Sequence, residues 1–415
     1  MPTRYAIVIA VDGLRASALG AYGNTWHPTP ALDRLASESH VFDWMIADSP
    51  QLAGFYRAAW FGLETPRDGV ERELTQLGNV PNLARRCESA GVQTALTTDD
   101  QWVAEQADQL GFSEVRGLEF PEPATADAVA DTELAQLFAI AADQIESWSV
   151  ADAATAAPPR LLWIHASGYH GAWDAPTELR QSLLDEEDPP ALEFVVPPAR
   201  LETNDHDEQL LHRSAYAAQT MVLDQCVGML LETLEGAGLA DSTLIALVGC
   251  RGFALGEHGA VGSDVRELYG ELTHVPLIVR LPDGGGAPPP RSSDLIQPRE
   301  IAPLLLRWFA ATPEQTALRA VITSDNAIAS AAAAAVRGAV FSSGQDGELA
   351  VRTGSWSLRQ VSEKASNGAQ TATVELFSKP DDRWEANEIA DRCPDEAAAM
   401  LALAAEFGRP APAVP

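Results

Sequence analysis

Tyr5-Ala-Ile-Val-Ile-Ala-Val11 is a continuous apolar run that stops at Asp12, and it determines the fold expected for this chain. A run of seven residues with several β-branched side chains predicts a strand. Because no polar residue alternates with the apolar ones, we expect both faces of the strand to be buried. The run is too short to span a bilayer and no cleavage site follows it, so we expect no signal peptide.

Similar short apolar runs recur along the chain and are separated by longer amphipathic segments. Strands are predicted at Val92–Thr97, Arg160–His165, Thr243–Val248 and Pro276–Leu281. Helices are predicted to begin at Pro30 with Thr29 as N-cap, and to cover Asn82–Ala90, Asp131–Trp148 and Leu210–Leu234. This alternation predicts an α/β domain over residues 1–320, with a mainly parallel sheet between helices.

The pattern changes beyond about Ala320. Antiparallel strands are predicted around Val351–Arg359 and at Thr373–Phe377, followed by a closing helix at Pro394–Phe407. We therefore expect residues 321–415 to form a smaller α+β subdomain. Loops are predicted where turn residues cluster, at Ala151–Pro159, Leu184–Asp207 and Asp283–Ser293.

The chain is strongly acidic: 59 Asp and Glu against 28 Lys and Arg give a net charge of −31 over 415 residues. Such a chain repels nucleic acid and anionic membranes, because phosphate binding needs clustered positive charge. The charge serves solubility or a salty cytoplasm, or it forms a docking face for a basic partner. The four cysteines are scattered without a CxxC pair, which fits a reducing cytosol, so we expect a cytoplasmic protein.

Polar residues follow three of the predicted strands, where ligands bind in a parallel α/β sheet. Asp12 follows the first strand, and His165 and His170 follow Leu161–Ile164. Cys250, Arg251 and His258 follow the strand that ends at Gly249. These side chains are expected to converge, although strand ends also hold polar residues that build turns.

Several motifs in order resemble the sulfatase family of the alkaline phosphatase superfamily. They are Val11–Asn24, Thr29–Ala36, Tyr216–Leu234, Leu255–Gly259, Tyr269, Val275–Pro282, Glu375–Phe377 and Glu388–Asp391. The resemblance covers nearly the whole chain and implies the sulfatase fold. For an active member it also implies hydrolysis of sulfate or phosphate esters.

The same resemblance implies that the catalytic groups are missing. The family segment Cys/Ser-x-Pro-Ser-Arg corresponds to Ala53–Arg57, so Ala53 stands where the formylglycine nucleophile forms. The family's Asp-Asp pair is Asp12-Gly13, and its Ser-Asp-His-Gly segment is Gly249-Cys250-Arg251-Gly252. Of the calcium ligands only Asp12 is retained, whereas calcium needs roughly 6–8 oxygens. We therefore expect no bound metal and no cofactor.

Other residues near the expected site have alternative roles. Arg57, His170 and His258 could contact an anion, or could form an ion pair, a backbone hydrogen bond and a turn, respectively. Ser49, Tyr56 and Cys250 lack an identifiable activating base. For Ser49 an N-cap role is favoured over a nucleophile, and for Cys250 a buried inert thiol.

The sequence therefore predicts a pseudoenzyme with a binding or regulatory role, for a small anionic ligand or a basic protein. A hydrolase with a non-standard site and an acidic interaction scaffold are the alternatives. The expected vestigial pocket comprises Asp12, Ala53, Arg57, His170, Cys250, Arg251 and His258. Within it, Arg251 is predicted to point at Asp12 and to replace the cation, because an unpaired buried carboxylate is costly.

Overall fold

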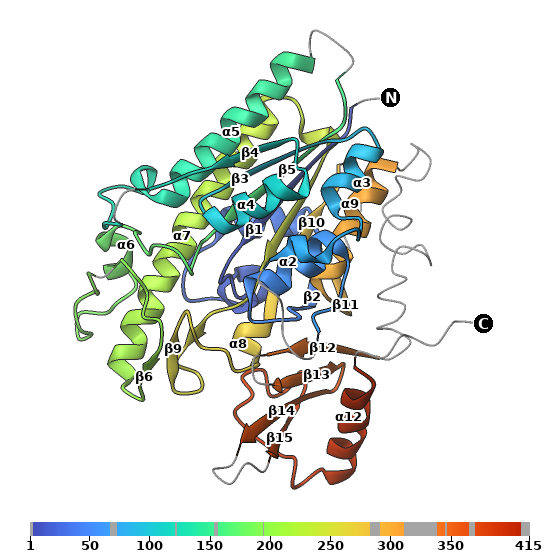
Figure 1. Ribbon diagram of the computed structural model, residues 1–415. Coiled ribbons are helices and arrows are strands. Elements are labelled where there is room, and N and C mark those ends of the chain that lie inside the picture. The colour runs from blue at the N-terminus through green and yellow to red at the C-terminus, as the bar shows by residue number, and fades with distance from the viewer. Residues whose placement is uncertain are drawn as a thin grey trace.

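A computed structural model describes residues 3–66, 73–120, 123–152, 157–193, 195–282, 291–310, 338–344, 347–364 and 370–407. Its centre is an eight-stranded sheet (Figure 1). From edge to edge the strands are β11 (Arg291–Ile296), β2 (His40–Ile46), β10 (His274–Arg280), β7 (Thr243–Gly249), β1 (Tyr5–Val11), β5 (Arg160–Ala166), β3 (Gln93–Thr98) and β4 (Glu114–Gly117).

Strand β1 lies in the middle of this sheet, as its apolar sequence predicts. All seven of its residues are buried, and it pairs in parallel with β5 on one side and β7 on the other. Its side chains alternate between two cores: Ile7 and Ile9 enter one, and Ala6 and Val8 enter the other. A strand buried on both faces needs no polar alternation, which explains the composition of the run.

The prediction of a mainly parallel sheet is confirmed, with one exception. Strand β10 runs antiparallel to both of its neighbours, β7 and β2, whereas the other pairings in the sheet are parallel. The apolar run at Pro276–Leu281 predicts the strand but not its direction, because period and burial are the same for both directions. Strand β2 is absent from the predicted strands, since His40 and Asp43 interrupt its apolar pattern.

Helices cover both faces of the sheet (Figure 1). One core contains residues of α1 (Pro30–Ser37), α5 (Glu133–Asp152) and α7 (His206–Gly236). The other contains residues of α2 (Leu52–Phe61), α3 (Leu83–Ser89), α4 (Gln101–Leu110) and α9 (Ile301–Ala310). None of the helices in the described ranges has the length and apolarity needed to cross a membrane.

Shorter elements connect these layers. The short α-helices are α6 (Thr177–Gln181) and α8 (Gly270–Thr273), and a small sheet contains β6 (Leu201–Glu202), β9 (Ala260–Gly262) and β8 (Ala254–Leu255). The 3-10 helices are η1 (Ala16–Ala18), η2 (Gly20–Tyr22), η3 (Leu74–Leu77), η4 (Val129–Asp131), η5 (Ala240–Ser242) and η6 (Pro298–Glu300).

Helices or a strand extend into each of the three segments predicted as loops. Helix α5 extends to Asp152, and residues 153–156 lie outside the described residues. Helix α7 begins at His206, inside the expected Leu184–Asp207 loop, because the Asp205 carboxylate accepts a hydrogen bond from the Asp207 N–H and caps the first turn. Of the loop predicted at Asp283–Ser293, residues 283–290 lie outside the described part of the chain and β11 begins at Arg291.

The C-terminal subdomain contains a separate antiparallel sheet and one long helix, as predicted (Figure 1). Its elements are β12 (Ala339–Ser343), β13 (Leu349–Thr353), β14 (Trp356–Lys364), β15 (Gln370–Ser378) and α12 (Pro394–Glu406). The Ser342 hydroxyl donates to the Ala47 carbonyl at 2.6 Å, and the Ser343 N–H donates to the Asp48 carbonyl at 2.9 Å. Strand β12 is therefore tied to the segment that follows β2. The predicted boundary near residue 320 falls outside the described residues.

Helix α1 begins at Pro30 after Thr29, as predicted, but a different residue caps it. The Thr29 hydroxyl makes no capping bond. Instead the Asp224 carboxylate of α7 accepts the N–H groups of Ala31 at 3.3 Å and Leu32 at 2.8 Å. A cap supplied by another helix fixes the position of α1 as well as its first turn.

We predict that Asp224→Ala lowers the free energy of unfolding by about 1–2 kcal/mol, because two helix N–H groups lose their acceptor. Urea denaturation measures the change, and the exposed Glu232→Ala on the same helix is the matched control. Equal effects of the two substitutions would contradict the assigned cap.

Candidate functional site

The carboxyl ends of β1, β5 and β7 lie side by side. Val11 pairs with Ala166 on β5 and with Gly249 on β7. Beyond the strands, the Asp12 N–H donates to the Ala166 carbonyl at 2.9 Å, and the Cys250 N–H donates to the Val11 carbonyl at 3.0 Å. The ends of these three strands therefore meet at one sheet edge, as predicted, but His258, which was expected to converge there, lies instead against Tyr269, Glu271 and Glu385.

Arg251 binds Asp12 through two parallel hydrogen bonds. Its Nε and Nη2 donate to Oδ1 and Oδ2 of Asp12, each at 2.8 Å. The side chain of Asp12 is 3% exposed and that of Arg251 is 19% exposed. The predicted contact between the two residues is confirmed, and both carboxylate oxygens are engaged by the guanidinium.

Burial and the ion pair act on the Asp12 carboxyl in opposite directions. Burial raises its pKa because it penalises the charged form, but the charge and hydrogen bonds of Arg251 outweigh burial and lower the pKa to about 2. The pKa of Arg251 is raised, since the Asp12 charge outweighs the effect of burial. Both groups are therefore ionised at neutral pH.

The same guanidinium also reaches the segment before α2. Its Nη1 donates to the Pro50 carbonyl at 2.9 Å. One side chain thus joins the end of β1, the end of β7 and the start of the helix that carries Ala53. The Pro50 contact could not be predicted from the sequence, because every residue has a backbone carbonyl that could accept the same hydrogen bond.

Gly13 has a conformation that hinders any side chain. Its φ is +78°, and a Cβ atom built there would lie 2.7 Å from Cβ of Tyr169. The carbonyl of Gly13 accepts a hydrogen bond of 2.8 Å from the Tyr216 hydroxyl of α7. The position directly after Asp12 therefore has a backbone turn that suits glycine.

Ala53 lies in the first turn of α2 and is partly exposed. Its methyl group has no atom that can attack an ester. Ser49 does not cap this helix: the N-cap is Gln51, and the Ser49 hydroxyl accepts the Gln51 N–H at 3.2 Å in the preceding turn. The N-cap prediction for Ser49 is therefore wrong, because the chain makes a further turn after Pro50.

Arg57, on the same helix, donates through Nε to the Glu64 carbonyl at 3.1 Å. This contact ties α2 to the chain that follows it. Tyr56 faces the core, and its ring lies 5.5 Å from that of His165.

Cys250 is fully buried, and its sulfur lies 4.0 Å from Nδ1 of His165. Burial raises the pKa of the Cys250 thiol well above its usual value, with a further contribution from the Asp12 charge. Burial likewise raises the pKa of Tyr56. A buried, protonated thiol or phenol is a poor nucleophile, so the geometry does not activate either group.

His170 takes the backbone role that the sequence left open. Its Nε2 lies 3.4 Å from the Gly252 carbonyl, and its ring packs at 5.4 Å against Phe253. Burial and the Arg251 charge lower its pKa to about 4. The imidazole is therefore neutral at pH 7 and offers no charge to an anion.

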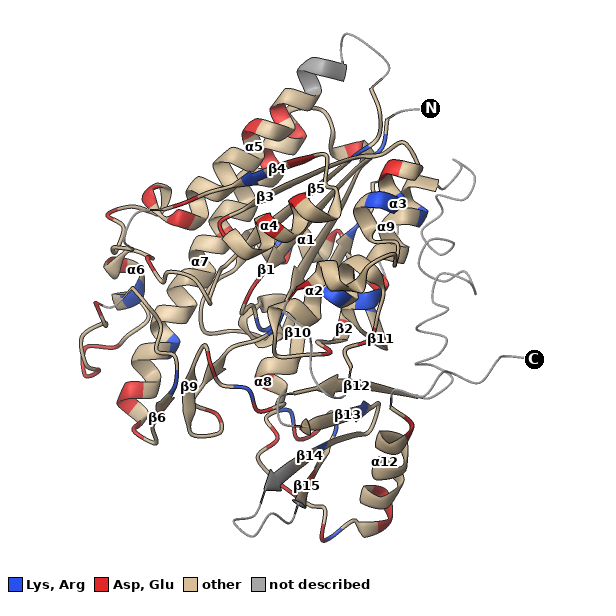
Figure 2. Ribbon diagram, in the orientation of Figure 1, with Lys and Arg blue, Asp and Glu red and all other residues tan. Residues whose placement is uncertain are grey.

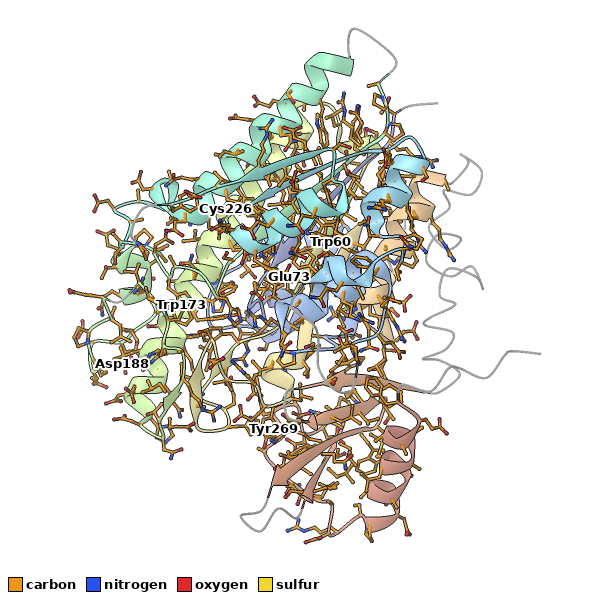
Figure 3. All side chains as sticks on the ribbon, in the orientation of Figure 1. Trp60, Glu73, Trp173, Asp188, Cys226 and Tyr269 are labelled. Carbon is orange, nitrogen blue, oxygen red and sulfur yellow. The ribbon has the colours of Figure 1, made fainter. Side chains whose placement is uncertain are left out.

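His258 contacts the junction with the C-terminal subdomain. Its ring stacks on Tyr269 at 3.6 Å, and its nitrogens lie 2.6 Å from Oε1 of Glu271 and 3.2 Å from the Glu385 carbonyl (Tyr269 is labelled in Figure 3). Burial lowers the pKa of His258, but Glu271 outweighs it and the net shift is upward. Its contacts join two parts of the fold.

The residues at the strand ends do not fit a calcium ion. Arg251 occupies both oxygens of Asp12, and a cation would have to displace a guanidinium that carries the same sign of charge. Within the described part of the chain, no group of three or more His, Cys, Asp and Glu side chains is arranged to hold a metal.

Solved structures of other proteins have the same architecture. A phosphonate monoester hydrolase of Agrobacterium radiobacter superposes with a TM-score of 0.68 at 16% identity, over 97% of this chain and 94% of that one. A structure solved with its substrate D-glucosamine-2-N,6-O-disulfate gives a TM-score of 0.69 at 17% identity, over 97% of both chains. The fold is that of the alkaline phosphatase superfamily.

Within that superfamily, the sulfatase family model matches residues 4–311, so the chain belongs to the sulfatase family. A stretch of 67 residues is 42% identical to an N-acetylglucosamine-6-O-sulfatase of Bacteroides thetaiotaomicron. That stretch is 16% of this chain and spans only 12% of the relative.

We predict that Arg251→Ala lowers the free energy of unfolding by about 3–5 kcal/mol, because Asp12 would keep a buried charge without its partner. Chemical denaturation measures the loss, and Arg251→Ala with Asp12→Asn should recover part of it. Arg200→Ala, which breaks an exposed ion pair with Glu267, is the control and should cost about 1 kcal/mol or less. Calcium should leave the stability of the unmutated protein unchanged; stabilisation by calcium would contradict the assignment.

Asp48, five residues before Ala53, gives a second prediction. Its Oδ2 accepts the N–H and hydroxyl of Thr65, and its Oδ1 has no hydrogen-bond partner within the described part of the chain. Burial raises the pKa of this carboxyl to about 7. In the unfolded chain the carboxyl loses its proton near pH 4, whereas in the folded chain it keeps the proton until about pH 7. Its contribution to stability therefore falls as pH rises through this window.

Asp48→Asn should flatten that part of the pH dependence. The measurement is the free energy of unfolding between pH 4 and pH 8, with the exposed Asp108→Asn on α4 as control. An unchanged slope in Asp48→Asn would refute the prediction.

Proposed function

We propose that this chain is a sulfatase-family pseudoenzyme, a binding or regulatory protein without sulfatase turnover. The observation that carries the proposal is the pair of 2.8 Å hydrogen bonds from Arg251 to Asp12, at the sheet edge where the family places its cation. Ala53 supports it, because formylglycine is made from Cys or Ser.

The chemistry of ester hydrolysis needs a nucleophile and a group that stabilises negative charge in the transition state. Ala53 supplies no nucleophile. Arg251 carries positive charge, but Asp12 already neutralises it and occupies two of its donors. The retained parts hold the strand ends and α2 together, which favours a structural use of the old site.

A hydrolase with a non-standard site is the second candidate. The phosphonate monoester hydrolase among the similar folds shows that this architecture is compatible with another ester class. It would need an attacking group other than Ala53, and the candidates Tyr56 and Cys250 are both buried beneath the site.

An acidic scaffold is the third candidate. Asp and Glu residues occur along α5, α7 and α12 and in the loops between elements, rather than in one cluster (Figure 2). A dispersed charge favours solubility over docking of one basic partner. Of the two partner classes considered for the pseudoenzyme, a small anionic ligand is therefore favoured over a basic protein.

We predict that the purified chain contains no stoichiometric calcium and hydrolyses aryl sulfate and aryl phosphate no faster than a buffer blank. Metal analysis and a chromogenic assay test both parts. Activity above background that Arg251→Ala or Cys250→Ala abolishes would overturn the proposal in favour of the hydrolase.

A further inference from the structure

A second charged site lies at the junction between the main body and the C-terminal subdomain. It is a cavity of about 50 Å³, separate from the Asp12–Arg251 pair. Its charged lining comprises Arg15 and Glu271 from the main body, and Arg352, Lys379, Arg383 and Glu385 from the subdomain. In Figure 1 the junction lies where α8 meets β12 and β13.

Four of these six groups, Arg15, Lys379, Glu385 and Glu271, have a partner of complementary charge or a shared proton. Arg15 Nη2 lies 2.6 Å from Oε1 of Glu257, and Lys379 Nζ lies 3.1 Å from Oε1 of Glu385. Glu271 bonds Nδ1 of His258 at 2.6 Å. These pairs leave the charges of Arg352 and Arg383 to be compensated.

Arg352 lines this cavity and has a guanidinium N–H group without an acceptor among the described residues. The residue is 6% exposed, and its Nη2 has no hydrogen-bond partner among the residues that the structure describes. Its Nη1 donates to the carbonyls of Thr353 and Trp356, and its guanidinium lies 4.9 Å from the ring of Trp44. None of these contacts is a carboxylate, and a buried guanidinium normally has one.

Arg383 is half-buried and also makes no contact with a carboxylate among the described residues. Its Nη2 donates to the Tyr22 carbonyl at 3.0 Å, and its guanidinium lies 5.0 Å from the Trp384 ring. Among the described residues, neither Arg352 nor Arg383 forms an ion pair with Asp or Glu. The cavity lining therefore holds two guanidinium groups without a carboxylate in direct contact, in a chain whose net charge is −31.

We propose that this cavity binds one compact oxyanion, phosphate or sulfate, which bridges the two parts of the fold. A cavity of about 50 Å³ admits a few waters or one tetrahedral oxyanion, since one water needs roughly 10–15 Å³. Ser357 lines the same cavity, opposite Arg352 in the β13–β14 ladder, and adds a hydroxyl donor. The proposal is independent of whether the Asp12 site turns over esters.

The test uses the full-length protein in a buffer without phosphate or sulfate. Thermal unfolding is followed while each anion is titrated from about 0.1 to 10 mM, with sodium chloride at matched ionic strength as reference. We expect a saturating rise in Tm of roughly 3–5 °C for phosphate or sulfate and none for chloride. No rise, an equal rise with chloride, or a rise that does not saturate would overturn the proposal.

Variants then locate the site. Arg352→Met keeps the aliphatic stem over Trp44 and should weaken phosphate binding at least about tenfold. Arg116→Met, on the edge strand β4, removes an exposed arginine paired with Glu114 and should leave binding unchanged. A saturating effect that persists in Arg352→Met would place the anion elsewhere.

Two further variants keep the test decisive if Arg352→Met does not fold. Ser357→Ala should weaken phosphate binding, and Glu385→Gln should strengthen it, because the latter removes a negative charge from the lining while keeping an acceptor for the Gly270 N–H. Unchanged affinity in both would refute the assignment.

Discussion

The bidentate contact between Arg251 and Asp12 is the interaction on which the arrangement of the strand ends depends. An aspartate directly after a strand buried on both faces lies in a region of low polarity, where it is stable only with a close positive charge. The guanidinium supplies that charge and, through Pro50, also fixes the start of α2. One side chain thereby connects three segments that are far apart in the sequence, at Asp12, Pro50 and Arg251.

A tethered cation differs from a bound ion in its thermodynamics. A metal contributes stability in proportion to the logarithm of its free concentration, whereas an arginine side chain is present at a fixed local concentration. The arginine also offers hydrogen bonds in one plane, while an ion draws ligands from all directions. The strand ends are therefore held together without any dependence on a free metal-ion concentration.

Much of the fold could be predicted from the sequence because buried strands and helix faces are made of apolar residues at a recognisable spacing. The seven apolar residues of β1 and the helices ended by glycine fall within a few residues of the predicted positions. Features that depend on contacts between distant segments could not be predicted. The direction of β10 and the capping of α1 by Asp224 are set by the tertiary arrangement.

The candidate site shows the same division. The Arg251–Asp12 contact could be predicted, because two charges that cannot remain unpaired occupy neighbouring strand ends. The position of His258 against the Glu385 carbonyl could not, since no residue pattern indicates where the subdomain packs against the main body. Backbone acceptors such as Pro50 carry no residue-type signal at all.

The turn at Gly13 leaves no room for a second carboxylate directly after Asp12. An aspartate at this position would need a left-handed backbone and would meet Tyr169, whose ring stacks on Tyr216 at 4.0 Å in the core. An added acidic group here would therefore require compensating changes in the core around these two tyrosines.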